Sequence, residues 1–130
     1  MQLQRVAITG VSAQCGLGNT MDEVWSAILE GKSGISTIEN ISDDMWPVQF
    51  AGTVKNFEIS EEILDKKEQK RFDTFIHYAL HCGAEAIKKS GLLDAGYDPL
   101  MIGSILGTGL GGFPIIEEMT MTYKEKGPRR

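Results

Sequence analysis

Cysteine and histidine are scarce in this sequence, with two of each among 130 residues. Cys15 and Cys82 lie far apart and neither belongs to a Cys-x-x-Cys pair, which excludes the common zinc and redox motifs and favours reduced thiols. His77 and His81 have the four-residue spacing of two metal ligands on one helix face, but no third ligand is evident nearby. We therefore predict packing or interface roles for both histidines, and no metal or cofactor.

Long apolar runs and an excess of basic residues are also missing. The apolar stretch near the N-terminus has only the length of a strand, too short for a signal-peptide core or a membrane span. With 13 basic and 18 acidic residues the net charge is -5, which argues against binding to nucleic acid or to anionic membranes. These absences predict a cytoplasmic protein without a membrane span.

Strand-like and helix-like segments alternate along the chain. Short apolar runs bounded by glycine or polar residues predict strands at 5–10, 50–57 and 101–106, with helical patterns between and after them. This alternation predicts an α/β fold with a largely parallel sheet, and the length suits one domain. Three short strands are few for such a sheet, so we expect the chain to be part of something larger.

The predicted helices have recognisable ends. Thr20 and Glu23 form a capping-box pattern at the start of the first helix, and Gly31 suits its C-terminus. Apolar residues recur at three- and four-residue spacing over 72–87, which predicts a long helix. Pro114 suits the first turn of a third helix.

A glycine-rich segment, Gly107-Thr108-Gly109-Leu110-Gly111-Gly112, follows the predicted strand at 101–106. Glycine permits a positive φ or close approach of another group to the backbone. The spacing matches the dinucleotide-binding pattern, which also needs an acidic residue about 20 positions later that does not occur before Arg130. A nucleotide-binding α/β domain therefore stays an alternative.

A basic cluster interrupts the acidic chain at Lys66, Lys67, Lys70 and Arg71. Three of these residues fall within just over one helical turn, so one face could present several cations to an acidic partner. A solvated helix start is the alternative interpretation.

Taken in order, six motifs resemble the start of a β-ketoacyl-acyl carrier protein synthase, and most closely the type II enzymes of bacterial fatty-acid synthesis. The motifs are Ile8-Thr9-Gly10, Gly18-Asn19-Thr20, Gly31-Lys32-Ser33-Gly34-Ile35, Phe50-Ala51-Gly52, Lys67-Glu68-Gln69 and the glycine-rich segment at 107–112. The resemblance implies a thiolase-like, layered α-β-α-β-α fold, usually in a homodimer. Residues 1–130 would supply only part of the N-terminal half of that synthase domain.

The resemblance implies an acyltransferase that condenses an enzyme-bound acyl group with malonyl-acyl carrier protein and releases carbon dioxide. In this family one cysteine carries the acyl chain and two histidines stabilise the developing enolate, and all three lie beyond the position that matches Arg130. Cys15, Cys82, His77 and His81 do not fall at those positions. We therefore assign no catalytic residue and expect the 130-residue chain alone to be inactive.

Two binding roles are implied by the same resemblance. Lys67, Lys70 and Arg71 match the region where the family docks its acidic acyl carrier protein. Leu110 matches the hydrophobic residue that gates the acyl pocket, and Gly109 and Gly111 flank it. The implied partners are acyl carrier protein, a fatty acyl chain and malonyl-acyl carrier protein.

Two further alternatives remain within the resemblance. The chain is either a part of a synthase or a non-enzymatic module that docks a carrier protein or pairs with another synthase chain. A fragment of a type I or polyketide ketosynthase would share the same motifs. On its own, such a part should expose apolar faces, which predicts poor solubility or association.

Overall fold

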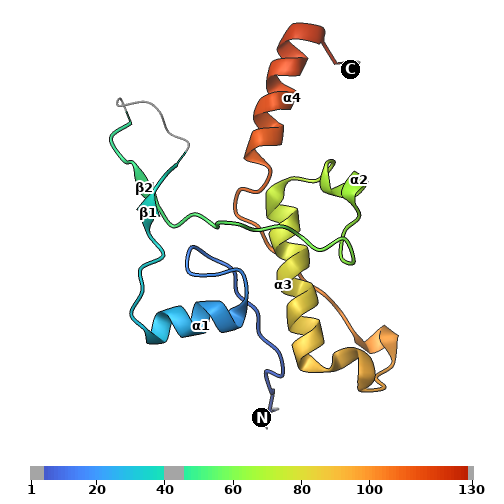
Figure 1. The fold of residues 1–130 in the computed structure, drawn as a ribbon. Coiled ribbons are helices and arrows are strands. Elements are labelled where there is room, and N and C mark those ends of the chain that lie inside the picture. The colour runs from blue at the N-terminus through green and yellow to red at the C-terminus, as the bar shows by residue number, and fades with distance from the viewer. Residues whose placement is uncertain (1–4, 40–45, 129–130) are drawn as a thin grey trace. The chain divides into compact units, whose positions relative to one another are not determined.

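The computed structural model describes residues 5–39 and 46–128 and divides them into two compact units. The first unit contains the described residues up to Glu58 together with Cys82–Gly96, and the second contains Ile59–His81 and the described residues from Tyr97 onward. The elements, shown in Figure 1, are α1 (Met21–Leu29), β1 (Ser36–Thr37), β2 (Phe50–Ala51), α2 (Lys66–Gln69), α3 (Thr74–Ser90), α4 (Phe113–Lys126) and the 3₁₀ turns Leu92–Asp94 and Pro99–Met101. Helix α3 contributes its first part to the second unit and its remainder to the first.

Helix α1 in the first unit confirms the predicted capping box. The Thr20 hydroxyl accepts a hydrogen bond from the Glu23 N–H at 3.3 Å, and the Glu23 carboxylate accepts one from the Thr20 N–H at 3.2 Å. Gly31 follows the helix with a φ of +67°, the left-handed conformation typical of a helix end. Local chemistry therefore sets both ends of α1.

A charged cluster joins three parts of the first unit. The Glu85 carboxylate on α3 accepts hydrogen bonds from the Ser12 hydroxyl, from the Met21 N–H at 3.4 Å and from the Lys89 ammonium at 2.9 Å. Lys89 also contacts the Asp22 carboxylate at 3.1 Å. Burial raises the pKa of Glu85, but these hydrogen bonds and the Lys89 charge outweigh it and leave the pKa lowered.

The second unit has its buried residues near α2. Ile59 and Leu64 are buried, and the Gln69 side-chain amide donates to the Leu64 carbonyl oxygen at 2.7 Å and to the Ile59 carbonyl oxygen at 3.3 Å. Asp65 caps α2, because its carboxylate accepts from the N–H groups of Lys67 and Glu68.

The strand predictions were largely wrong. Among the described residues the only strand pair is β1–β2, which is antiparallel and joins Ser36 to Ala51, so the prediction at 50–57 shrinks to two residues. Residues 5–10 and 101–106 form no strand, and Ile105 is 99% exposed. An apolar run specifies a strand only when a neighbouring strand satisfies its backbone hydrogen bonds, and no described segment does so here.

The helix predictions at 72–87 and from Phe113 are confirmed. α3 ends at Ser90, followed by Gly91 with a φ of +65°, and Pro114 stands in the first turn of α4. Among the described residues, no helix is both long and apolar enough to cross a membrane. Large apolar side chains such as Val6 and Ile8 are exposed. That the chain is part of a larger domain stays a prediction.

Candidate functional site

The glycine-rich segment lies in the second unit and leads into α4. Gly112 has a φ of +79° and its carbonyl oxygen accepts the Ile116 N–H at 2.9 Å, so it is the N-cap residue that directly precedes α4. A Cβ atom at Gly111 would lie 2.7 Å from the Phe75 ring and 2.8 Å from the Thr108 hydroxyl oxygen. Only a glycine fits at position 111 without displacing a neighbour, and position 112 favours glycine because of its φ.

The other two glycines of this segment have no such requirement. A Cβ atom at Gly107 or at Gly109 would meet no described atom within 4 Å, and neither residue has a positive φ. Between the two halves of the segment stands Leu110, whose side chain is 82% exposed. The predicted gate residue is therefore accessible and lies next to the constrained pair of glycines.

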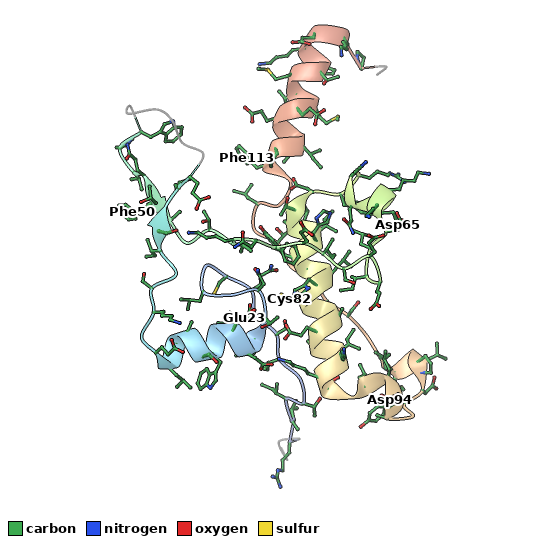
Figure 2. All side chains as sticks on the ribbon, viewed as in Figure 1. Glu23, Phe50, Asp65, Cys82, Asp94 and Phe113 are labelled. Atoms are coloured by element: carbon green, nitrogen blue, oxygen red, sulfur yellow. The ribbon has the colours of Figure 1, made fainter. Side chains whose placement is uncertain are left out.

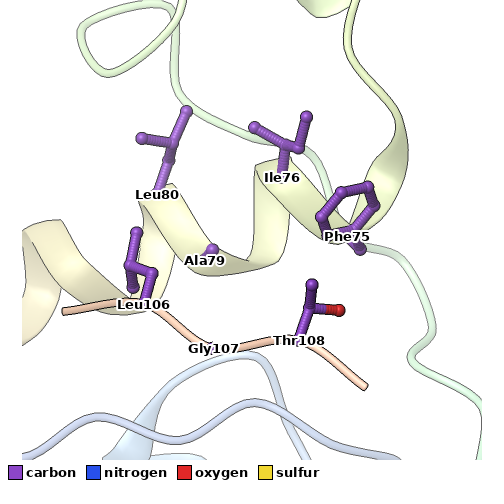
Figure 3. Close-up of a pocket in the computed structure, with 7 residues that line it drawn as sticks. All are labelled: Phe75, Ile76, Ala79, Leu80, Leu106, Gly107 and Thr108. Carbon is purple, nitrogen blue, oxygen red and sulfur yellow. The ribbon is translucent and has the colours of Figure 1, made fainter. Parts of the chain in front are cut away.

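An apolar groove borders the start of this segment (Figure 3). One wall comes from α3 and the other from Leu106 and the first two residues of the glycine-rich segment, and the volume is about 250 Å³. The lining residues are Phe75, Ile76, Ala79, Leu80, Leu106, Gly107 and Thr108. None of these residues is charged, so the groove suits an apolar group, and Leu110 does not line it.

The predicted docking residues Lys67, Lys70 and Arg71 lie on α2 and directly after it, and all three are exposed. Spacings of three and four residues place Lys67 near the other two on the helix surface. Within the described part of the chain none of the three forms an ion pair, whereas Lys66 contacts the Glu61 carboxylate at 2.8 Å. Figure 2 shows the side chains around α2, near the label of Asp65.

The cysteines and histidines form no metal site in the residues that the structure describes. Both thiols are free, and no group of three or more possible metal ligands occurs there. The Nε2 atom of His77 is buried without a hydrogen-bond partner. The hypothesis that both histidines have packing or interface roles is compatible with this placement and stays a prediction.

Two features of the structure have little signal in the sequence. Phe75 belongs to the apolar stripe of a helix, and that pattern does not indicate that its ring lies against Gly111. The Ser12–Glu85 hydrogen bond joins residues 73 positions apart, and no local pattern indicates it. Only the four-residue spacing of Glu85 and Lys89 was visible in the sequence as an ion-pair signal.

The sequence matches the family described as beta-ketoacyl synthase, N-terminal domain, over residues 3–130. It is 37% identical over 130 residues to 3-oxoacyl-[acyl-carrier-protein] synthase 2 of Vibrio harveyi and 34% identical to the protein of that name from Synechocystis, covering all of this chain and 31% of each relative. It is 38% identical over 129 residues to the Staphylococcus aureus (strain N315) protein of the same name, covering 99% of this chain and 31% of that protein. The chain belongs to the beta-ketoacyl synthase family, and the region it matches is the family's N-terminal domain.

Proposed function

We propose that this chain is the N-terminal part of a 3-oxoacyl-acyl carrier protein synthase that elongates fatty acids by decarboxylative condensation. The observation that carries the proposal is the identity of 34–38% with proteins of that name over essentially the whole chain. The resemblance puts the catalytic cysteine and histidines beyond the position that matches Arg130. Residues 1–130 would therefore contribute binding surfaces and supply none of the reacting side chains.

The proposal includes the layered, thiolase-like fold, a homodimeric complete protein and a cytoplasmic location. The fold is supported by the exposed apolar runs, which include Ile8 and Ile105 and which a completed sheet would cover. The dimer and the location rest on the family resemblance alone.

The experiment is an assay of the protein in the form in which the cell makes it. Acyl-acyl carrier protein and malonyl-acyl carrier protein are supplied, and formation of the 3-oxoacyl product is followed together with release of carbon dioxide. We expect one carbon dioxide for each product formed. Absence of both products from a folded protein would contradict the proposal.

Carrier docking is proposed for Lys67, Lys70 and Arg71. Their support is that all three are exposed on about one turn and hold no ion pair within the described residues, so their charges are available to an acidic surface. A charged surface of this kind mainly raises the association rate and the specificity for an acidic partner. Its contribution to affinity falls as the salt concentration rises.

A gate for the acyl chain is proposed at Gly109-Leu110-Gly111. Leu110 is an exposed apolar residue, and it is joined to the constrained Gly111 on one side and to the unconstrained Gly109 on the other. A larger side chain at 110 should occupy space that the acyl chain needs. We expect Leu110→Phe to shorten the longest acyl chain that the synthase accepts.

The exposed apolar runs also favour a second candidate, a module that pairs with another synthase chain and catalyses nothing. Sedimentation of the native protein, with its mass measured in parallel, distinguishes the two. A chain of this length that forms a stoichiometric complex with a separate synthase would support the pairing module.

A further inference from the structure

We infer that Phe75 is a positioning residue: its ring holds Gly111 in the glycine-rich segment, here called the turn (Gly107–Gly112), and so sets the location of Leu110. The inference rests on the proposed gate role of Leu110. Phe75 is not a catalytic residue, because it would act on the acyl chain only through the turn.

The contact between Phe75 and the turn is close and extends over two consecutive residues. The ring atoms Cδ2 and Cε2 each lie 2.7 Å from the position of a Cβ atom at Gly111, and Cε1 lies 3.5 Å from that position at Gly112. At 2.7 Å no side chain fits at 111 unless the ring moves. The aromatic ring therefore packs directly on the backbone of the turn.

Hydrogen bonds at the start of α3 fix the backbone that carries the Phe75 ring. It belongs to the first turn of α3, where the Ile76 N–H donates to the Asp73 carbonyl oxygen at 2.9 Å and the Asp73 carboxylate accepts from the Thr74 N–H. The Thr108 hydroxyl oxygen lies 2.8 Å from the same Cβ position of Gly111. The aromatic ring and the hydroxyl group thus both occupy the space that a side chain at 111 would need.

This crowding ends at Leu110. Gly109, on its other side, has no described atom within 4 Å of its Cβ position. Leu110 therefore has one neighbour, Gly111, that packs against the Phe75 ring and one neighbour, Gly109, whose Cβ position is open. Removing the ring should let Leu110 occupy a wider range of positions. The synthase should then discriminate less sharply between acyl chains of different length.

The first experiment compares Phe75→Ala with the unmodified synthase in the form that the cell makes. We expect the ratio of kcat/KM for a long acyl substrate to that for a short one to change at least threefold, with a broader product profile. Phe75→Leu, which keeps an apolar side chain on α3, should shift the ratio less. An unchanged ratio together with a lowered Tm would reduce Phe75 to a merely structural role and overturn the inference.

The second experiment tests the contact itself by a double-mutant cycle on Tm. Gly111→Ala should lower Tm in the presence of Phe75 and lower it less in Phe75→Ala, because the new methyl group then meets the Thr108 hydroxyl but no longer the ring. Gly107→Ala is the matched control, since its Cβ would meet open space, and it should be additive with Phe75→Ala. The inference would be overturned if Gly107→Ala and Gly111→Ala lowered Tm equally, or if the Tm changes of Gly111→Ala and Phe75→Ala were additive.

Leu110→Phe separates failure of the inference from failure of the proposed function. If Leu110→Phe shortens the accepted chain but Phe75→Ala leaves the ratio unchanged, the gate stands and only the inference fails. If Leu110→Phe has no effect on the profile of an active synthase, the gate proposal fails and takes the inference with it. If the unmodified protein has no condensing activity, the proposed function fails, and the Tm cycle still decides whether Phe75 holds the turn.

Discussion

Two charged regions of this molecule differ in whether their charges are paired. In the first unit, Lys89 lies between the Glu85 and Asp22 carboxylates, and Glu85 also accepts from the Ser12 hydroxyl. In the second unit, Lys67, Lys70 and Arg71 are exposed without an ion pair in the described residues. Paired charges join segments of one fold, whereas unpaired cations on a surface remain available to a partner.

The largest expected effect comes from breaking the paired cluster. Glu85→Ala removes the acceptor of three hydrogen bonds and leaves the Ser12 hydroxyl without it, which should lower the free energy of unfolding by about 2 kcal/mol. Urea denaturation measures the loss. Glu117→Ala, at an exposed carboxylate on α4, is the control and should change stability by less than about 0.5 kcal/mol. Equal effects of the two substitutions would show that the cluster contributes little.

Reversing the unpaired charges should leave stability nearly unchanged and weaken binding. For the variant with both Lys67→Glu and Arg71→Glu we expect about tenfold lower affinity for acyl carrier protein at low salt, and a smaller loss at high salt. Titration calorimetry at two ionic strengths measures both. The control with Lys88→Glu and Lys124→Glu makes the same change in net charge at other exposed positions. Similar affinity in the two double variants would contradict docking at α2.

The paired cluster should also respond to acid. Because the pKa of Glu85 is lowered in the folded protein, its stabilising contribution is present above the unfolded pKa of about 4.5 and is lost as the pH falls through the folded pKa. The free energy of unfolding should therefore fall more steeply below about pH 4.5 in the unmodified protein than in Glu85→Gln. Denaturation curves between neutral and acidic pH test this, and parallel pH profiles would mean that Glu85 does not contribute.

The smallest expected effect comes from converting a paired cation into an unpaired one. Glu61→Gln releases Lys66 from its ion pair and adds one free cation beside Lys67. Affinity for acyl carrier protein should rise about twofold at low salt, while stability changes by less than about 0.5 kcal/mol because the pair is exposed. Glu117→Gln, which adds the same charge away from α2, should have no such effect on affinity. A fall in affinity for acyl carrier protein in Glu61→Gln would contradict the view that unpaired cations at α2 are available to a partner.

Sequence patterns predicted the helices better than the strands. Helix ends depend on nearby residues, such as the Thr20–Glu23 capping box, and the apolar stripe of α3 repeats within one segment. The apolar runs at 5–10 and 101–106 have the composition of strands but no described partner. Strand formation depends on hydrogen bonds between distant segments, which a local pattern does not contain.

The candidate site also divides into features that local sequence predicts and features that depend on distant residues. The glycine-rich segment and the basic cluster could be predicted, because they stand out in the composition of the sequence. Which glycines are constrained was not visible, since the requirement at Gly111 comes from the Phe75 ring, 36 positions earlier in the chain. The ion pair that neutralises Lys66 could not be predicted either, since it depends on the conformation of the segment that carries Glu61.

The family, the helix caps, the apolar stripe of α3 and the concentration of positive charge at α2 follow from the sequence alone. The folded chain was needed to show that a side chain at 111 would collide with Phe75, that Glu85 joins Ser12 to Lys89, and that Lys67, Lys70 and Arg71 keep their charges unpaired within the described residues. The two groups differ in the range of the interactions that produce them. Caps and stripes act within a few residues, whereas steric exclusion and charge pairing act between side chains that only the path of the backbone brings together.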